Sequence, residues 1–90
     1  MLEAKIKIIN QLGLHARAAA QLVRLAATFK SRILLKRRDN AVVADAKSIL
    51  SVLALAASKG IELDLEVAGA DEQEALQAVE NLFSSGFGEL

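Results

Sequence analysis

Residues 61–67, IELDLEV, alternate strictly between apolar and acidic side chains, and this alternation constrains the fold more than any other stretch. A period of two is typical of a strand with one buried and one solvated face. Residues 2–8 have the same period, and two further strands, residues 32–38 and 41–44, flank an Asp-Asn pair suited to a hairpin turn. Strands that are polar on one side favour an antiparallel or mixed sheet that is covered on one face.

Three other segments have the spacing of helices. Residues 16–29 carry apolar side chains at intervals of three and four. A short helix over residues 48–57 begins after Ser48, a good N-cap, and is ended by Gly60. Residues 69–83 carry acidic side chains in their first turn, where the helix dipole favours them. The order βαββαβα predicts an α+β fold: a two-layer open-faced sandwich, in which three helices cover one face of a four-stranded, mainly antiparallel sheet.

Composition limits the classes of protein that fit this pattern. Ninety residues, 53% hydrophobic but only 3% aromatic, predict a single domain over residues 1–90 with an aliphatic core. No cysteine is present, and eleven basic residues balance eleven acidic ones, so neither a thiolate metal site nor a nucleic-acid or membrane surface is indicated. The longest nearly apolar run, residues 49–57, is far shorter than the ~20 residues of a membrane span. We expect a soluble, cytoplasmic monomer without a secretory signal, metal or cofactor.

The only histidine, His15, stands at the start of GLHARAAAQL, directly before the first helical segment. This placement predicts His15 at the N-cap, beside backbone N–H groups that have no helical partner and attract anions such as phosphate. The positive end of the helix also disfavours an imidazolium, which predicts a neutral, nucleophilic ring. Arg17 can add a guanidinium fork to phosphate oxygens. These groups together suit a histidine that accepts a phosphoryl group and passes it on.

Three alternative roles exist for a lone histidine: a solvent-facing or capping side chain without chemistry, a metal ligand, and a member of a hydrolytic triad. A metal site lacks a second histidine or a cysteine, and no Gly-x-Ser-x-Gly turn presents a nucleophilic serine. The chain also has no Gly-x-x-x-x-Gly-Lys-[Ser/Thr] loop for a nucleotide. A protein that accepts phosphate without binding ATP must receive it from another protein, which favours a carrier over a kinase.

Three stretches, GLHARAAAQLV, DAKSILSVL and SKGIELDLEVAGADEQEAL, resemble the histidine-containing phosphocarrier (HPr/NPr) family of the bacterial phosphotransferase system. The resemblance implies that Enzyme I, charged by phosphoenolpyruvate, phosphorylates His15 at Nδ1, and that the phosphoryl group then passes to EIIA-type domains. It implies that Arg17 and the N–H groups of Ala16 and Arg17 steady the phosphate. Ser48 matches the family's regulatory serine, the target in many bacteria of an HPr kinase/phosphorylase, although it is also an ordinary N-cap.

One position departs from the family motif. The family usually continues Arg-Pro-Ala, whereas this chain has Ala18 and Ala19 after Arg17. Proline in a first helical turn removes no needed donor and fixes φ, whereas alanine does not preset the bend. Neither side chain contacts phosphate, so we expect the chemistry to survive.

Two groups of residues are candidates for a surface that docks partner proteins. A helix as apolar as residues 48–57 cannot bury every side chain in a two-layer domain, so part of it is expected to form an exposed patch. In the family the matching positions face Enzyme I and EIIA, and Arg17 would add a basic rim for acidic partners. The basic residues 36–38 invite a nucleic-acid interpretation, but a charged hairpin tip without aromatic side chains is usually only solvated. The candidate docking residues are Ala20, Arg24, Ala27, Ile49, Leu50 and Leu53.

A second class of function stays open: a regulatory adaptor of the same fold that binds partners through the second helix without accepting phosphate. The sequence also leaves open whether a carrier would serve sugar uptake or the nitrogen-related branch, although the ending LFSSGFGEL is similar to the latter.

Overall fold

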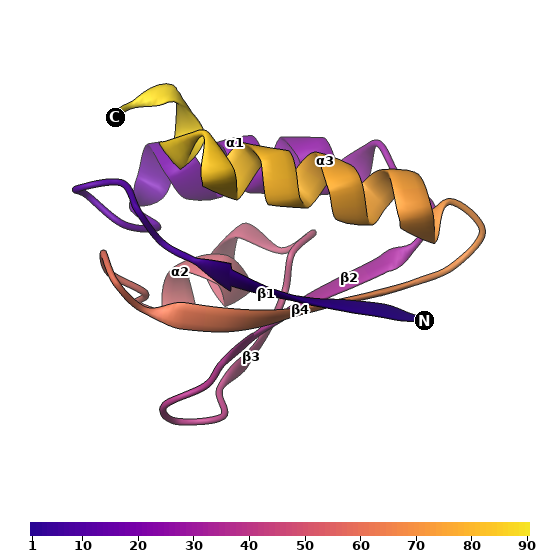
Figure 1. Cartoon of the computed structure of the whole chain (residues 1–90), viewed down its shortest axis with the longest axis horizontal. Coiled ribbons are helices and arrows are strands. Elements are labelled where there is room, and N and C mark those ends of the chain that lie inside the picture. The colour runs from indigo at the N-terminus through magenta and orange to yellow at the C-terminus, as the bar shows by residue number, and fades with distance from the viewer.

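The computed structural model describes residues 1–90 and contains a four-stranded sheet in the order β1-β4-β2-β3, with every neighbouring pair antiparallel. Helices α1 and α3 pack against each other over one face of this sheet, and α2 packs against α1 and β3 (Figure 1). The predicted open-faced sandwich is confirmed. The elements are β1 (Leu2–Lys7), α1 (Ala16–Ala27), β2 (Arg32–Arg37), β3 (Val43–Asp45), α2 (Ile49–Ala54), β4 (Glu62–Ala68), α3 (Glu72–Ser84) and a 3₁₀ turn, η1 (Gly86–Gly88).

The core lies between the sheet and the helices, where the alternation in the sequence places it. In β4 the three apolar side chains that alternate with the acidic ones, Leu63, Leu65 and Val67, are fully buried, and β2 contributes Ile33 and Leu35 in the same way. The helices close the core with Leu22 from α1 and with Val79 and Phe83 from α3. Three of the four buried residues of α1 are alanines, and α1 packs against α2 and α3. No helix is long and apolar enough to cross a bilayer.

Two of the three basic residues at the β2–β3 hairpin, Arg37 and Arg38, contact other groups of the protein. The guanidinium of Arg37 donates to Asp39 (Nε–Oδ1 2.8 Å) and to the backbone oxygen of Leu55 (2.8 Å). Arg38 lies 3.8 Å from a carboxylate oxygen of Glu62 and 3.6 Å from one of Asp64, on the open face of the sheet. Arg37 therefore has a structural role that its sequence context did not indicate, whereas Lys36 and Arg38 are exposed as expected of a hairpin tip.

The second helix is shorter than predicted: it ends at Ala54, and Gly60 does not cap it. The carbonyl oxygens of Leu55 and Ala56 accept hydrogen bonds from Arg37, and that of Ala57 accepts one from the N–H of Leu14. Ala56 turns the chain with a φ of 50°. The carbonyl groups after α2 therefore accept tertiary hydrogen bonds instead of helical ones, and the helix ends before them.

Other boundaries also differ from the sequence-based prediction: α3 begins at Glu72 rather than residue 69, and β1, β2 and β4 differ by one residue. Helix α1 ends at Ala27 rather than at residue 29, and Thr28 is its C-cap. The third strand covers Val43–Asp45 rather than residues 41–44, because the hairpin turn includes Ala41 with a φ of 61°. The Asp-Asn pair lies within that turn, as predicted.

Asp71 ties the start of α3 to the segment before β2. Its carboxylate accepts hydrogen bonds from the N–H of Lys30 (2.8 Å), the N–H of Ser31 (2.9 Å) and the hydroxyl of Ser31 (2.6 Å). The Ser31 hydroxyl, followed by the Lys30 N–H, lowers the pKa of Asp71 from 3.8 to about 2, because these donors favour the ionised form. No pattern in the sequence indicates this contact between residues forty positions apart.

Because the pKa of Asp71 is lower in the folded protein, its ionised form stabilises the fold above the ordinary value of 3.8. That contribution should be lost as the pH falls from 3.8 to about 2. We expect Asp71→Asn to be less stable than the wild type at neutral pH and to lose less stability over this acid range. Urea unfolding at a series of pH values measures this. Glu74→Gln removes an exposed carboxylate from α3 and should show the same change of unfolding free energy with pH as the wild type. The same pH dependence in Asp71→Asn would contradict the role given to the Asp71 carboxylate.

Candidate functional site

The loop between β1 and α1 presents His15, and the shape of this loop depends on Gly13. Gly13 has a φ of 64°, and a Cβ atom there would lie 2.6 Å from the carbonyl oxygen of Ala57. The next residue, Leu14, is buried and donates its N–H to that same oxygen at 2.9 Å. The loop is thus fastened to the segment after α2, and the chain enters α1 directly from this contact.

His15 is the N-cap of α1, as predicted, with an extended backbone (φ −73°, ψ 178°). Its side chain makes no capping hydrogen bond and is 25% exposed. The backbone N–H groups of Ala16, Arg17 and Ala18 have no acceptor within the protein. These donors and the positive end of the helix dipole lie next to a partly exposed imidazole, an arrangement that can bind an anion such as a phosphoryl group.

Arg17 and Ala18 lie on opposite sides of the first turn of α1. Arg17 is exposed, on the solvent side of the turn. Ala18 is fully buried, and its N–H has no acceptor, so a proline at this position would lose no hydrogen bond. Alanine and proline at position 18 therefore leave the same hydrogen bonds within the protein.

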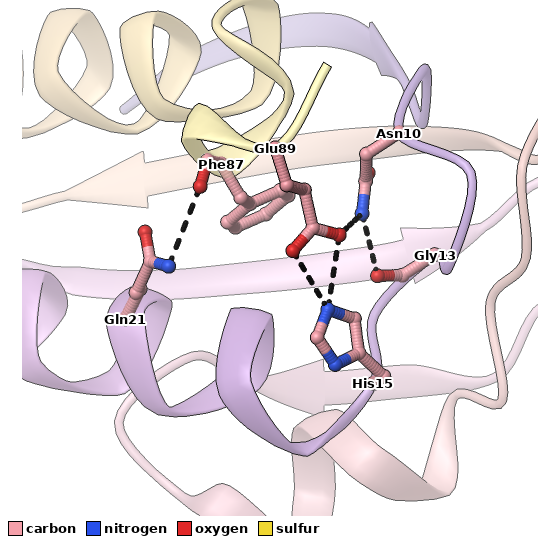
Figure 2. Close-up of polar contacts among 6 residues, drawn as sticks. All are labelled: Asn10, Gly13, His15, Gln21, Phe87 and Glu89. Carbon is pink, nitrogen blue, oxygen red and sulfur yellow. Dashed lines mark hydrogen bonds and ion pairs between the residues drawn. The ribbon is translucent and has the colours of Figure 1, made fainter.

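A carboxylate from the other end of the chain reaches the imidazole. Nε2 of His15 lies 2.9 Å from Oε1 and 3.0 Å from Oε2 of Glu89, and Nδ2 of Asn10 donates to Oε1 at 2.7 Å (Figure 2). The Asn10 side chain is fully buried and also donates to the carbonyl oxygen of Gly13 at 2.8 Å. The second ring nitrogen, Nδ1, lies on the side of the ring turned away from Glu89 (Figure 2).

The amide of Asn10 is the largest cause of a pKa of Glu89 below its ordinary value. Partial burial opposes this effect, whereas the hydrogen bond to His15 and the positive charges of His15 and Arg17 add to it. Glu89 is therefore a carboxylate at neutral pH.

Sequence reasoning missed Glu89 and Asn10 as members of the site. The one local signal is the Gly-Phe-Gly sequence of η1, which indicates a turn. It does not show the direction in which the chain leaves that turn, so nothing in the sequence places residue 89 beside residue 15.

Ser48 is the N-cap of α2, as predicted, and its hydroxyl oxygen accepts the N–H of Ser51 at 3.3 Å. It is half-buried. The three apolar candidates that follow lie with it on α2: Leu50 is 78% exposed, whereas Ile49 and Leu53 are 38% and 37% exposed. Val52 of the same helix is fully buried. Helix α2 thus divides into a core side and an exposed apolar side.

The other three candidate docking residues belong to α1, which packs against α2. Arg24 and Ala27 are exposed and Ala20 is half-buried. Most of the six candidate docking residues are therefore accessible to solvent.

Comparisons with known proteins agree with this geometry. The sequence profile described as "PTS HPr component phosphorylation site" matches residues 2–85. The phosphocarrier protein HPr of Cupriavidus necator is 48% identical over 99% of this chain and 98% of its own length. The phosphocarrier protein NPr of Escherichia coli K12 is 43% identical over 93% of this chain and 92% of its own length.

Solved structures give the same result. The crystal structure of HPr-C-His from Thermoanaerobacter tengcongensis superposes with a TM-score of 0.92 at 40% identity and covers 100% of this chain and 99% of that one. A crystal structure of an HPr dimer from the same organism superposes with a TM-score of 0.78, also at 40% identity, and covers 99% of this chain and 100% of that one.

Proposed function

The chain belongs to the HPr family of phosphocarrier proteins of the phosphotransferase system, and on this premise we propose that His15 carries the phosphoryl group. Phosphorylated Enzyme I, charged by phosphoenolpyruvate, is the donor, and EIIA-type domains are the acceptors. The protein is then a stoichiometric carrier in the cytoplasm rather than an enzyme, and it needs no metal or nucleotide. We expect it to act as a monomer, without insertion into a membrane or binding to nucleic acid.

The position of His15 at the start of α1 is the single observation that carries this proposal. The lone pair of Nδ1 attacks phosphorus, and the bond between phosphorus and the donor atom of Enzyme I breaks, its electron pair remaining with Enzyme I. Transfer to EIIA is the same step with this protein as the donor. The unpaired N–H groups of Ala16, Arg17 and Ala18 can stabilise the phosphoryl oxygens, and the Arg17 guanidinium can share their charge.

Incubation with Enzyme I and phosphoenolpyruvate tests the proposal. We expect the mass of the protein to increase by one phosphoryl group, with phosphate that is labile in acid and stable in base, as a phosphohistidine is. The labelled protein should then lose its phosphate to an added EIIA domain. Absence of the mass increase, or phosphate that withstands acid, would contradict the carrier function.

The partner surface of the proposal consists of the six docking residues on α1 and α2. The apolar side of α2 supplies Leu50 as its most exposed side chain, and burial of such a side chain against a partner is favourable. Arg17 and Arg24 add positive charge at the edge, which favours and accelerates encounter with acidic partners.

Ser48 is proposed as a regulatory phosphosite, the target of an HPr kinase/phosphorylase where one exists. A phosphate there is stabilised by the start of α2 and adds negative charge beside the apolar side of that helix. This charge would repel an acidic partner without disturbing the fold.

Ser48→Asp, a mimic of that phosphate, should slow phosphorylation of His15 by Enzyme I about tenfold or more, because like charges across an interface disfavour docking. Its thermal unfolding should stay close to that of the wild type, since aspartate is also a good N-cap. Single-turnover kinetics with phosphorylated Enzyme I measure the rate. Asn40→Asp, which adds the same charge in the exposed hairpin turn, should keep the wild-type rate, and equal rates for both variants would count against a role for Ser48.

The exposed apolar side of α2 also favours a second candidate, an adaptor that binds partners without accepting phosphate. The phosphorylation experiment separates the two, because an adaptor gains no acid-labile phosphate. Transfer to a panel of EIIA domains then distinguishes a carrier for sugar uptake from one of the nitrogen-related branch.

A further inference from the structure

The chain after α3 folds back so that Glu89 reaches His15. Phe87 is buried and packs edge-to-face on Phe83, with ring centroids 4.9 Å apart at 70°. Its backbone has a φ of 58°, between two glycines that also have positive φ, and its carbonyl oxygen accepts a hydrogen bond from Gln21 of α1 (3.4 Å) (Figure 2). The turn is thus anchored to the core and to α1, and Glu89 is held two residues beyond that anchor.

Asn10 fixes the other side of Glu89. The fully buried amide donates to Oε1 and to the loop carbonyl of Gly13, so the carboxylate and the loop that presents His15 share one rigid donor. Both carboxylate oxygens then lie within 3.0 Å of Nε2. An ionised carboxylate has no proton to give and can only accept, so Nε2 must carry the hydrogen in this contact.

We propose that Glu89 is a positioning residue that holds His15 in the tautomer with the proton on Nε2, which leaves the lone pair of Nδ1 free to accept the phosphoryl group. This inference rests on the proposed function and adds to it the reason why Nδ1 is the acceptor. It gives Glu89 the part that a carboxylate plays when it orients a catalytic histidine through the opposite ring nitrogen.

The transfer step balances without any proton leaving His15. When Nδ1 forms its bond to phosphorus, the ring becomes a cation that keeps its Nε2 proton. Glu89 lies on that proton and compensates the positive charge. When EIIA takes the phosphoryl group, the electron pair of the N–P bond returns to Nδ1, and the ring is again neutral with its proton on Nε2. The depressed pKa of Glu89 agrees with a carboxylate that stays ionised throughout.

Glu89→Gln and Glu89→Ala distinguish this role from simple support of the turn. In Glu89→Gln, Asn10 holds the new amide oxygen at the Oε1 position, which places the amide nitrogen where Oε2 lies, 3.0 Å from Nε2. That nitrogen is a donor and opposes a proton on Nε2, whereas the amide oxygen, 2.9 Å from Nε2, can still accept one, so the preference for the Nε2–H tautomer should weaken. Glu89→Ala removes both oxygens and should leave the ring free to adopt either tautomer.

Two measurements are made on the wild type, both variants and Glu74→Gln, a control that removes one exposed carboxylate of α3. The first is the ¹⁵N chemical shifts of the imidazole, which belong to the single histidine, recorded above the pH at which the ring is seen to titrate. The second is the single-turnover rate of phosphorylation by phosphorylated Enzyme I. Thermal unfolding shows that each variant is folded.

We expect an Nε2–H ring in the wild type and in Glu74→Gln, and a larger share of the Nδ1–H tautomer in Glu89→Gln and Glu89→Ala. Both Glu89 variants should accept phosphate about tenfold or more slowly than the wild type, because the tautomer with a free Nδ1 lone pair is less populated and no carboxylate compensates the positive charge of the phosphorylated ring. The same tautomer in all four proteins, or wild-type rates in both Glu89 variants, would overturn the role of Glu89. Failure of the wild type to gain phosphate would refute the carrier function instead, and the tautomer measurement does not depend on it.

Discussion

Replacing His15 with alanine should abolish the acceptance of phosphate from Enzyme I. His15 is the only histidine, so no other imidazole can take its place. We expect no detectable mass increase in His15→Ala after incubation with Enzyme I and phosphoenolpyruvate, under conditions that phosphorylate the wild type completely.

The fold of His15→Ala should survive, which makes the loss of phosphate specific. The side chain is partly exposed and makes no capping hydrogen bond to α1. Thermal unfolding and circular dichroism should therefore resemble those of the wild type. A folded His15→Ala protein that still gained acid-labile phosphate would remove His15 from the mechanism.

Replacing Gly13 with alanine should destabilise the protein more than any of the other proposed substitutions. Alanine in the left-handed region costs about 1–2 kcal/mol. The added Cβ would also meet the Ala57 carbonyl oxygen at 2.6 Å and Cα of Ser58 at 2.8 Å, both of them backbone atoms. Forcing such an overlap to relax adds about 1–3 kcal/mol. We expect the free energy of unfolding, from urea denaturation, to fall by about 2–5 kcal/mol.

Gly60→Ala is the matched control, because Gly60 also has a positive φ, of 92°, but a Cβ there meets nothing within 4 Å. It should cost only the backbone part, about 1–2 kcal/mol. Gly13→Ala should in addition slow phosphorylation of His15, since the clash displaces the loop that presents the ring. Equal destabilisation of the two variants would show that the close approach of Gly13 to Ala57 does not limit the loop.

Much of the fold could be predicted from the sequence because its signals are local. Alternation in residues 61–67 indicated the buried side of β4, and the caps His15 and Ser48 indicated the starts of α1 and α2. The end of α2 was placed too late, since the hydrogen bonds from Arg37 and Leu14 that draw the chain away come from distant segments. Periodicity in the sequence indicates which face of an element is buried. It does not indicate which distant N–H group donates a hydrogen bond to a given carbonyl oxygen.

The candidate site divides in the same way. The sequence by itself determined the histidine, its place at the start of a helix and the arginine two residues on, because a helix start is fixed by a few neighbouring residues. Only the tertiary structure decided what faces the other side of the ring: His15 and Glu89 are 74 positions apart, and Asn10 and Glu89 are 79 apart. The position of Glu89 depends on where the side chain of Phe87 is buried and on a left-handed backbone at a residue that rarely adopts one. Packing of the whole core sets both, and no short stretch of sequence encodes that packing.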